Sequence, residues 1–245
     1  MDRRKALTSI AQLSALGVAA STNAAILNHK SQRPPGSPDS GLPAPISKGG
    51  YVYFSAGEAK EVGAIFDRLI PADELGMSAS DAGCVVYTDR QLAGPFGKAA
   101  SVYRLGPIKD GTPQQGPQMK QTPAKRYRVG LVGLDTYCRQ QFGGKPFSAL
   151  NEDQQVDILT KMEAGKLSFA GTDGQEFFAL LLQNVQEGYL SDPIYGGNKD
   201  MCGWKMIGYP GARYDYRDWI DRHNERYPLP PVGISGRPEW MPKGT

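Results

Sequence analysis

The side chains that could carry out acid–base chemistry are few and scattered. Asp73 and Glu74 are adjacent, and two neighbouring carboxylates can bind a cation or act as general acid and base. They follow a predicted helix in a loop, where solvated charges are the favoured interpretation. His223 lies in the charged run 221–225 and could act as a general base. No nucleophile is close to it in sequence, so neither feature predicts an active site.

The histidines and cysteines limit the metal and haem chemistry of the chain. With only His29 and His223, a zinc site built on several histidines is excluded. Cys84, Cys138 and Cys202 are far apart, and no C-x-x-C-H motif is present to attach a c-type haem. The glycine motifs of nucleotide-binding proteins and hydrolases are also absent. In an oxidising compartment the simplest expectation is one disulfide and one free thiol, with three possible pairings.

Aromatic side chains gather in the last quarter of the chain. Residues 189–240 hold all three tryptophans and six of the twelve tyrosines, a composition typical of interface anchors. The run 214–219 alternates aromatic and charged residues and could stack on a flavin or a haem edge. A protein–protein contact is the favoured interpretation of that run. The alternative, that the aromatic side chains cover the chain's own helices, stays open.

The composition indicates one globular domain with many loops. The chain has 245 residues, 40% of them hydrophobic, with 30 Gly and 19 Pro. Its 28 basic and 25 acidic residues give a net charge of +3, which is too balanced for nucleic-acid binding.

The N-terminal residues 1–25 predict an export signal. Arg3, Arg4 and Lys5 form a basic start, a weakly apolar run covers 6–20, and residues 22–24 fit a small-x-small cleavage site. The paired Arg3 and Arg4 favour the twin-arginine route, which exports folded cargo with its cofactor bound. The alternative is an amphipathic helix with a chance arginine pair. The run is too short and polar to span a membrane, so we expect a periplasmic protein.

The elements after the signal are a linker and a helical domain. The Pro-rich segment 26–50 predicts an extended linker, followed by a domain over 51–245. A capping box at Ser55 and Glu58 begins a first helix, which ends before Pro71. Its apolar positions recur at helical spacing: Val62, Ile65, Phe66 and Leu69.

Four further helices are predicted by the same signals. The second covers 80–92, with Val85, Val86 and Leu92 facing inward, and the third covers 123–142 after a long loop at 106–123. A fourth begins at Asn151, and its apolar residues are Val156, Ile158, Leu159 and Met162. The fifth begins at Asp173 and is the most apolar, so we expect it at the centre of the core. No segment alternates with period two. The fold class is therefore all-α, one irregular domain of roughly five helices with an extended aromatic tail from about residue 190.

A family resemblance rests on the residues that follow the fifth helix. The run Asp192-Pro193-Ile194-Tyr195-Gly196-Gly197-Asn198, then Gly203-Trp204, then Gly208-Tyr209-Pro210-Gly211-Ala212, resembles the signature of the gluconate 2-dehydrogenase subunit 3 family. Segments 54–71, 89–94 and 147–154 are also similar, and the likeness spans most of 52–213. Cys202 stands where a small or apolar residue is expected.

The resemblance implies an accessory subunit of an oxidoreductase complex, with no catalytic residue and no cofactor of its own. The implied partners are a large FAD flavoprotein of the glucose–methanol–choline oxidoreductase type and a multi-haem cytochrome c. Substrate is oxidised at the FAD, and electrons pass through haem c to membrane quinone. The small subunit would support folding, stability and twin-arginine co-export of the flavoprotein, and would meet the inner membrane only through the complex. The substrate stays open among sugars, sugar acids and alcohols.

The expected partner interface lies in the signature and the tail. Its candidate residues are Tyr195, Gly196, Gly197, Asn198, Trp204, Tyr209, Pro210, Gly211, Tyr214, Tyr216 and Trp219. The signature glycines would allow close backbone approach to the partner or simply tight internal turns. Two alternatives from other classes are a free-standing periplasmic sugar-binding protein and an enzyme in its own right.

Overall fold

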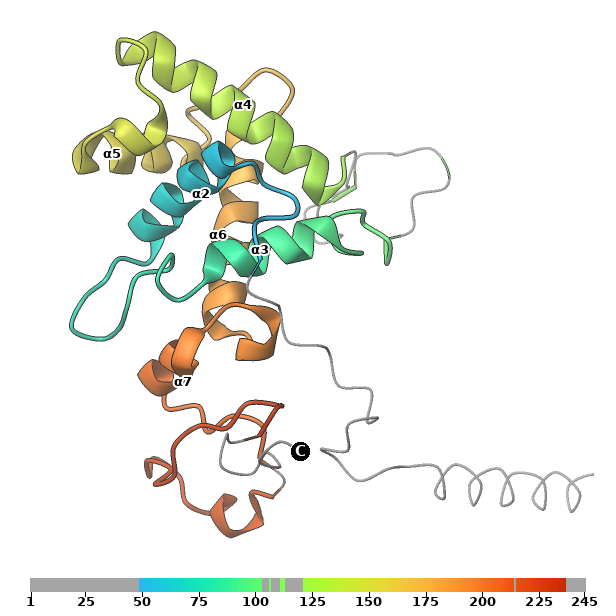
Figure 1. The fold of residues 1–245 in the computed structure, drawn as a ribbon, viewed down its shortest axis with the longest axis vertical. Coiled ribbons are helices and arrows are strands. Elements are labelled where there is room, and N and C mark those ends of the chain that lie inside the picture. The colour runs from blue at the N-terminus through green and yellow to red at the C-terminus, as the bar shows by residue number, and fades with distance from the viewer. Residues whose placement is uncertain (1–48, 103–105, 107–110, 113–120, 214, 237–245) are drawn as a thin grey trace, which may run out of the picture. The chain divides into compact units, whose positions relative to one another are not determined.

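A computed structural model describes residues 49–102, 106, 111–112, 121–213 and 215–236 (Figure 1). In these residues it contains six α-helices, four short 3-10 helices and isolated β-bridges, without a sheet. The all-α prediction is confirmed. Every helix in this part of the chain is too short or too polar to cross a membrane.

Predicted capping residues begin three of the long helices, and the fourth has a cap that was not predicted. Helix α2 covers Ala56–Leu69 with the capping box at Ser55, and α5 covers Glu152–Glu163 with a second box at Asn151. Helix α6 covers Gly174–Leu190 after Asp173, whose carboxylate accepts from the Glu176 N–H. Helix α4 covers Pro123–Gln141, where Thr122 is the cap and proline fills the first helical position.

Three details differ from the predictions. Helix α3 covers Cys84–Ala93, later than the predicted start at residue 80, because Gly83 has a φ of 84° and turns precede it. Val156 is 50% exposed, and the buried polar Gln155 takes the inward position beside it. A sixth helix, α7 at Cys202–Ile207, lies in the segment predicted as tail.

Helix α6 is the centre of the core, as its apolar sequence predicts. It contacts α2, α3, α4, α5 and α7, and Figure 1 shows it passing between the other helices. Tyr127 of α4 packs edge-on against Phe177 of α6, with ring centroids 5.8 Å apart, and donates its hydroxyl to Asn184 Oδ1 at 3.0 Å. Burial of these side chains stabilises the helical body.

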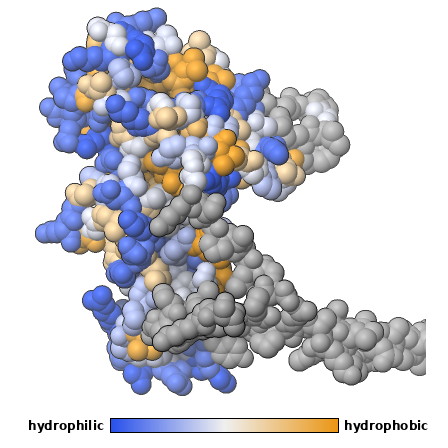
Figure 2. Space-filling model, in the orientation of Figure 1, coloured by the Kyte–Doolittle hydropathy of each residue, from blue (hydrophilic) through white to orange (hydrophobic). Residues whose placement is uncertain are grey.

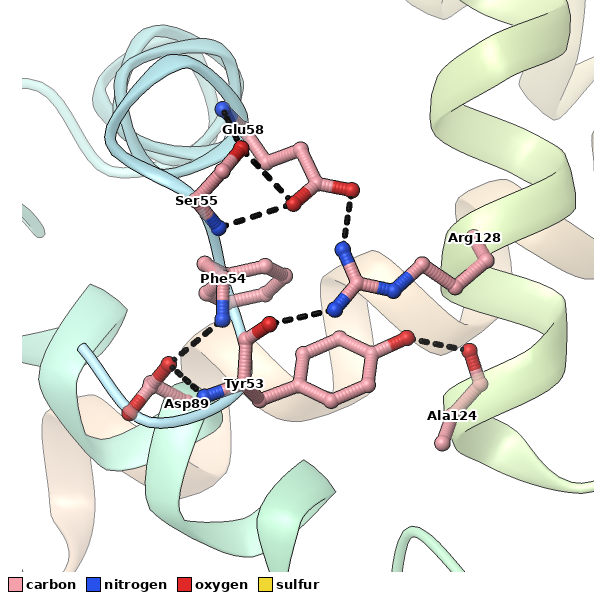
Figure 3. A network of polar contacts seen from close by, with 7 residues as sticks. All are labelled: Tyr53, Phe54, Ser55, Glu58, Asp89, Ala124 and Arg128. Carbon is pink, nitrogen blue, oxygen red and sulfur yellow. Dashed lines mark hydrogen bonds and ion pairs between the residues drawn. The ribbon is translucent and has the colours of Figure 1, made fainter.

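The chain reaches this body through a short strap, residues 50–54, of which Figure 3 draws Tyr53 and Phe54. The buried Asp89 carboxylate of α3 accepts hydrogen bonds from the backbone N–H groups of Val52, Tyr53 and Phe54, each at 2.8 Å. Arg128 of α4 donates to the Tyr53 carbonyl, pairs with Glu58 and lies over the Tyr53 ring, 4.1 Å from its centroid. The strap is therefore fixed to α2, α3 and α4 by charged side chains whose hydrogen-bonding capacity is used.

Candidate functional site

The signature segment, residues 188–211, packs against the helical body through glycines. A Cβ on Gly197 would stand 2.1 Å from the Gly188 carbonyl oxygen, and one on Gly83 would stand 2.4 Å from that of Gly196. A Cβ on Gly203 would stand 2.1 Å from the Tyr189 carbonyl oxygen. The close backbone approach that these glycines allow is thus made inside the chain, between α3, the end of α6 and the start of α7.

Asn198 is the polar centre of the signature segment. Its side chain is fully buried, donates from Nδ2 to the Ser191 carbonyl at 2.7 Å and accepts the Gly203 N–H at Oδ1 at 2.8 Å. Its backbone has a φ of 48°, in the left-handed region that asparagine tolerates better than most residues. The residue therefore fixes both the turn and the start of α7.

Trp204 and Cys202 of α7 also face inward. The Trp204 ring is 5% exposed, and its Nε1 donates to the Leu190 carbonyl at 2.7 Å. The Cys202 sulfur lies 3.8 Å from Asn198 Oδ1, and the side chain is buried beside Tyr189. The unexpected cysteine in the signature is thus a small core side chain.

The three cysteines are all free thiols, so the expected disulfide is not formed. Burial raises the pKa of Cys84 to about 12, and the nearby Cys202 adds to the rise. Burial likewise raises the pKa of Cys138 to about 12, and that of Cys202 is raised above its ordinary value. Buried neutral thiols of this kind are poor nucleophiles.

The C-terminal arm, residues 212–236, folds back on the signature segment. Val232 is buried and pairs with Gly211, and the Ala212 N–H donates to the Val232 carbonyl at 2.6 Å. The Asp192 carboxylate accepts the Ile194 N–H at 3.0 Å and the Ile234 N–H at 2.6 Å. The arm is therefore held at both ends and is less extended than the sequence predicts.

Aromatic rings and arginines organise the arm. Tyr227 contacts Trp219 and Tyr216 edge-on, with centroid distances of 5.0 and 6.0 Å. Arg213 lies 4.9 Å from the centroid of Tyr227, and Arg222 lies 4.7 Å from that of Trp219. The Tyr216 hydroxyl donates to the Gly211 carbonyl at 2.6 Å, which joins this cluster to the signature segment.

An open cleft lies between the end of α7 and the arm, and we call it the arm cleft. Its lining includes Tyr216, Trp219 and three aliphatic side chains that stay exposed: Met206 by 43%, Ile207 by 55% and Ile220 by 65%. Lys205, Arg222, Arg226 and Glu225 complete its charged lining. On the face that Figure 2 draws, hydrophobic residues form separate patches between hydrophilic ones.

The predicted interface residues divide by burial. Four are buried in this chain: Gly197, Asn198, Trp204 and Gly211. Five are half-buried: Tyr195, Gly196, Pro210, Tyr216 and Trp219. Tyr209 is 46% exposed. Tyr214, Arg3 and Arg4 lie outside the described residues. Sequence reasoning missed three exposed apolar residues, Met206, Ile207 and Ile220. The only signal for them in the sequence is the apolar pair that directly follows Lys205, and the helix that ends with this pair was not predicted.

The residues considered above for acid–base chemistry lie in a loop and in the arm. The Asp73 carboxylate accepts from the Leu75 and Gly76 N–H groups at 2.8 and 3.1 Å, which shapes its loop, and His223 is exposed in the arm. Among the described residues, no group of three or more His, Cys, Asp or Glu side chains is placed to hold a metal ion. The arrangement of the described site is suited to protein contact through apolar and cationic side chains.

The comparisons with known proteins agree with the resemblance. A family model described as Gluconate 2-dehydrogenase subunit 3 matches residues 56–211, which is more than half of the chain. The match begins with α2 and ends at Gly211, the last residue of the signature segment. No curated protein and no solved structure matches the chain.

Proposed function

The chain belongs to the gluconate 2-dehydrogenase subunit 3 family, and we propose that it is the non-catalytic small subunit of a periplasmic FAD-dependent dehydrogenase complex that oxidises a sugar or sugar acid. The family match over residues 56–211 carries this proposal, because a subunit of this family belongs to a multi-subunit dehydrogenase. FAD and haem c are assigned to partner chains, a large flavoprotein of the glucose–methanol–choline oxidoreductase type and a multi-haem cytochrome c.

The proposed role is to stabilise the flavoprotein and to export it. A flavoprotein takes up FAD in the cytoplasm and must then cross the membrane folded, which the twin-arginine route allows. Arg3 and Arg4 of this chain would supply the address for both proteins. The firmly held strap at residues 50–54 supports this role, since several charged hydrogen bonds fix the chain to the folded body directly after the predicted signal and linker.

Mild affinity purification of the tagged chain from the periplasm and membranes of its native cells tests the complex. We expect a large chain to co-purify and the eluate to show flavin and c-haem absorption. A colourless, solitary chain would contradict the proposal.

The export role has its own test. In cells that make the Arg3→Lys/Arg4→Lys double variant, we expect both the small subunit and the flavoprotein to stay in the cytoplasm. Arg33→Lys, an arginine outside the predicted signal, is the matched control and should leave export unchanged. A flavoprotein that reaches the periplasm normally in the double variant would contradict co-export.

A further inference from the structure

The arm cleft carries apolar side chains that this chain leaves uncovered. Met206, Ile207 and Ile220 come from two different elements, the end of α7 and the turn after the 3-10 helix η5 at Arg217–Trp219, and meet around one cleft. Single exposed aliphatic side chains are ordinary on a protein surface, whereas several gathered in one concave site mark an interaction surface.

The cleft is held in shape by contacts within the chain. Tyr227 packs on Trp219 and Tyr216, and the Tyr216 hydroxyl is bonded to the Gly211 carbonyl at 2.6 Å. Because these side chains are already ordered, a partner would lose little conformational entropy in ordering them.

The charges of the cleft select the chemistry of the occupant. Three cations, Lys205, Arg222 and Arg226, line it together with one carboxylate, Glu225. The Arg222–Glu225 pair is long, at 3.9 Å, and both side chains are more than half exposed. Neither Lys205 nor Arg226 is within an ion-pair distance of a described carboxylate. The site therefore has a surplus of positive charge around its exposed apolar side chains.

We propose that the arm cleft binds an apolar side chain flanked by carboxylates on the flavoprotein partner. The apolar side chain covers Met206, Ile207 and Ile220, and the carboxylates pair with Lys205 and Arg226. This inference rests on the proposed function for the existence of the partner. The cleft lies mostly beyond the span of the family match, which ends at Gly211, so it is a feature of this chain's arm as well as of the shared body.

Co-purification from native cells tests the apolar contact. Ile207→Glu and Ile220→Glu, introduced singly in the tagged full chain, should lower flavoprotein recovery by about tenfold or more, as expected for a central interface residue. Val132→Glu is the matched control, because Val132 is 66% exposed on α4, far along the chain from the arm. It should keep wild-type recovery, and all three variants should keep the wild-type melting temperature.

Carbodiimide cross-linking of the purified complex tests the charge. We expect Lys205 to couple to an Asp or Glu of the flavoprotein, with the site mapped by mass spectrometry. Lys205→Arg keeps the charge but cannot form the amide, so it should retain binding and lose that cross-link.

The outcomes separate this inference from the proposed function. If the wild-type chain brings down no flavoprotein, both are overturned. If the wild-type chain does recover the flavoprotein, any of three results overturns the inference alone. These are normal flavoprotein recovery with Ile207→Glu, an equal loss of recovery with the control Val132→Glu, and the absence of a cross-link at Lys205. If the mature chain associates with itself and Ile207→Glu abolishes this, the cleft is assigned to a second copy instead. If the chain binds phosphatidylglycerol vesicles and Ile207→Glu abolishes this, the cleft is assigned to lipid.

Discussion

Asn198 Oδ1 accepts the backbone N–H of Gly203 at 2.8 Å, and this bond supplies the cap that α7 otherwise lacks. The residue directly before the helix, Met201, has a φ of 56° and offers no side-chain cap. Asp200 has a φ of 54° as well, so the turn is formed by residues in a sparsely populated conformation. A buried amide side chain, bonded on both sides, compensates for that strain.

Asn198→Ala should therefore destabilise the chain strongly. It leaves the Ser191 carbonyl and the Gly203 N–H without the partner that each has now, and it places alanine at a φ of 48°. We expect a loss of about 2–4 kcal/mol in the free energy of unfolding, measured by denaturant titration.

Asp200→Ala is the control for the backbone effect alone. Asp200 shares the left-handed conformation but its side chain is exposed, so we expect a loss of about 1 kcal/mol or less. Equal losses for the two variants would show that the Asn198 side-chain bonds contribute nothing.

The long helices could be predicted because their signals are local. Ser55, Asn151 and Asp173 each cap a helix at the predicted residue, and apolar spacing selects the buried side chains Ile65, Phe66, Leu92, Ile158 and Met162. Val156 belongs to the apolar set of the fourth predicted helix but is exposed, because the inward residue beside it is polar: Gln155 is buried and donates to the Phe147 carbonyl at 2.9 Å. A buried polar side chain whose hydrogen bond goes to the backbone of another element cannot be recognised from the pattern of hydrophobic residues.

Helix α7 and the burial of the aromatic side chains could not be predicted in this way. The helix is six residues long and contains glycine, and its stability comes from the tertiary bonds of Asn198 and Trp204. Trp204 and Tyr209 lie five positions apart in one aromatic segment, yet one is 5% and the other 46% exposed. Composition gives the content of such a segment, and only the tertiary packing decides which rings are covered.

Gly197→Ala and Gly57→Ala should change stability in opposite directions. A methyl group on Gly197 would overlap the Gly188 carbonyl oxygen, a backbone atom of α6, so we expect a loss of about 2 kcal/mol or more. Gly57 lies in the first turn of α2 with open space around it, where alanine should add up to about 1 kcal/mol through helix propensity. Thermal unfolding of the two variants beside the wild type measures both signs. A Gly197→Ala variant as stable as the wild type would show that the signature glycines are needed for something other than internal packing.

The Glu58 carboxyl should make stability depend on acid pH. Its partial burial raises the pKa, but the hydrogen bonds from Arg128 and Ser55 outweigh it and hold the pKa below its ordinary value of 4.5. A group whose pKa is lowered by folding stabilises the fold above its unfolded-state pKa, and the contribution is lost as the pH falls through the folded-state value. Glu58→Gln should therefore cost about 1 kcal/mol at neutral pH, and the gap to the wild type should narrow as the pH drops below about 4.5.

Asp157→Asn is the control for the removal of one surface carboxylate. It breaks the exposed pair with Lys161 at 2.6 Å and should lower the free energy of unfolding much less than Glu58→Gln does. A Glu58→Gln gap that stays constant from neutral pH to pH 3 would contradict the assigned role of the carboxylate.

The buried thiols should be unreactive in the folded chain and all present in the unfolded one. Burial raises the pKa of Cys84 and of Cys138 to about 12, so almost no thiolate exists near pH 8, and the sulfurs are also covered. We expect no rapid reaction of the native protein with a thiolate-specific reagent, and three thiols per chain in guanidinium without reductant. Cys138→Ser should lower that count to two. A count of one in the unfolded wild type would show that two of the cysteines become linked in the cell, where the structure has three free thiols.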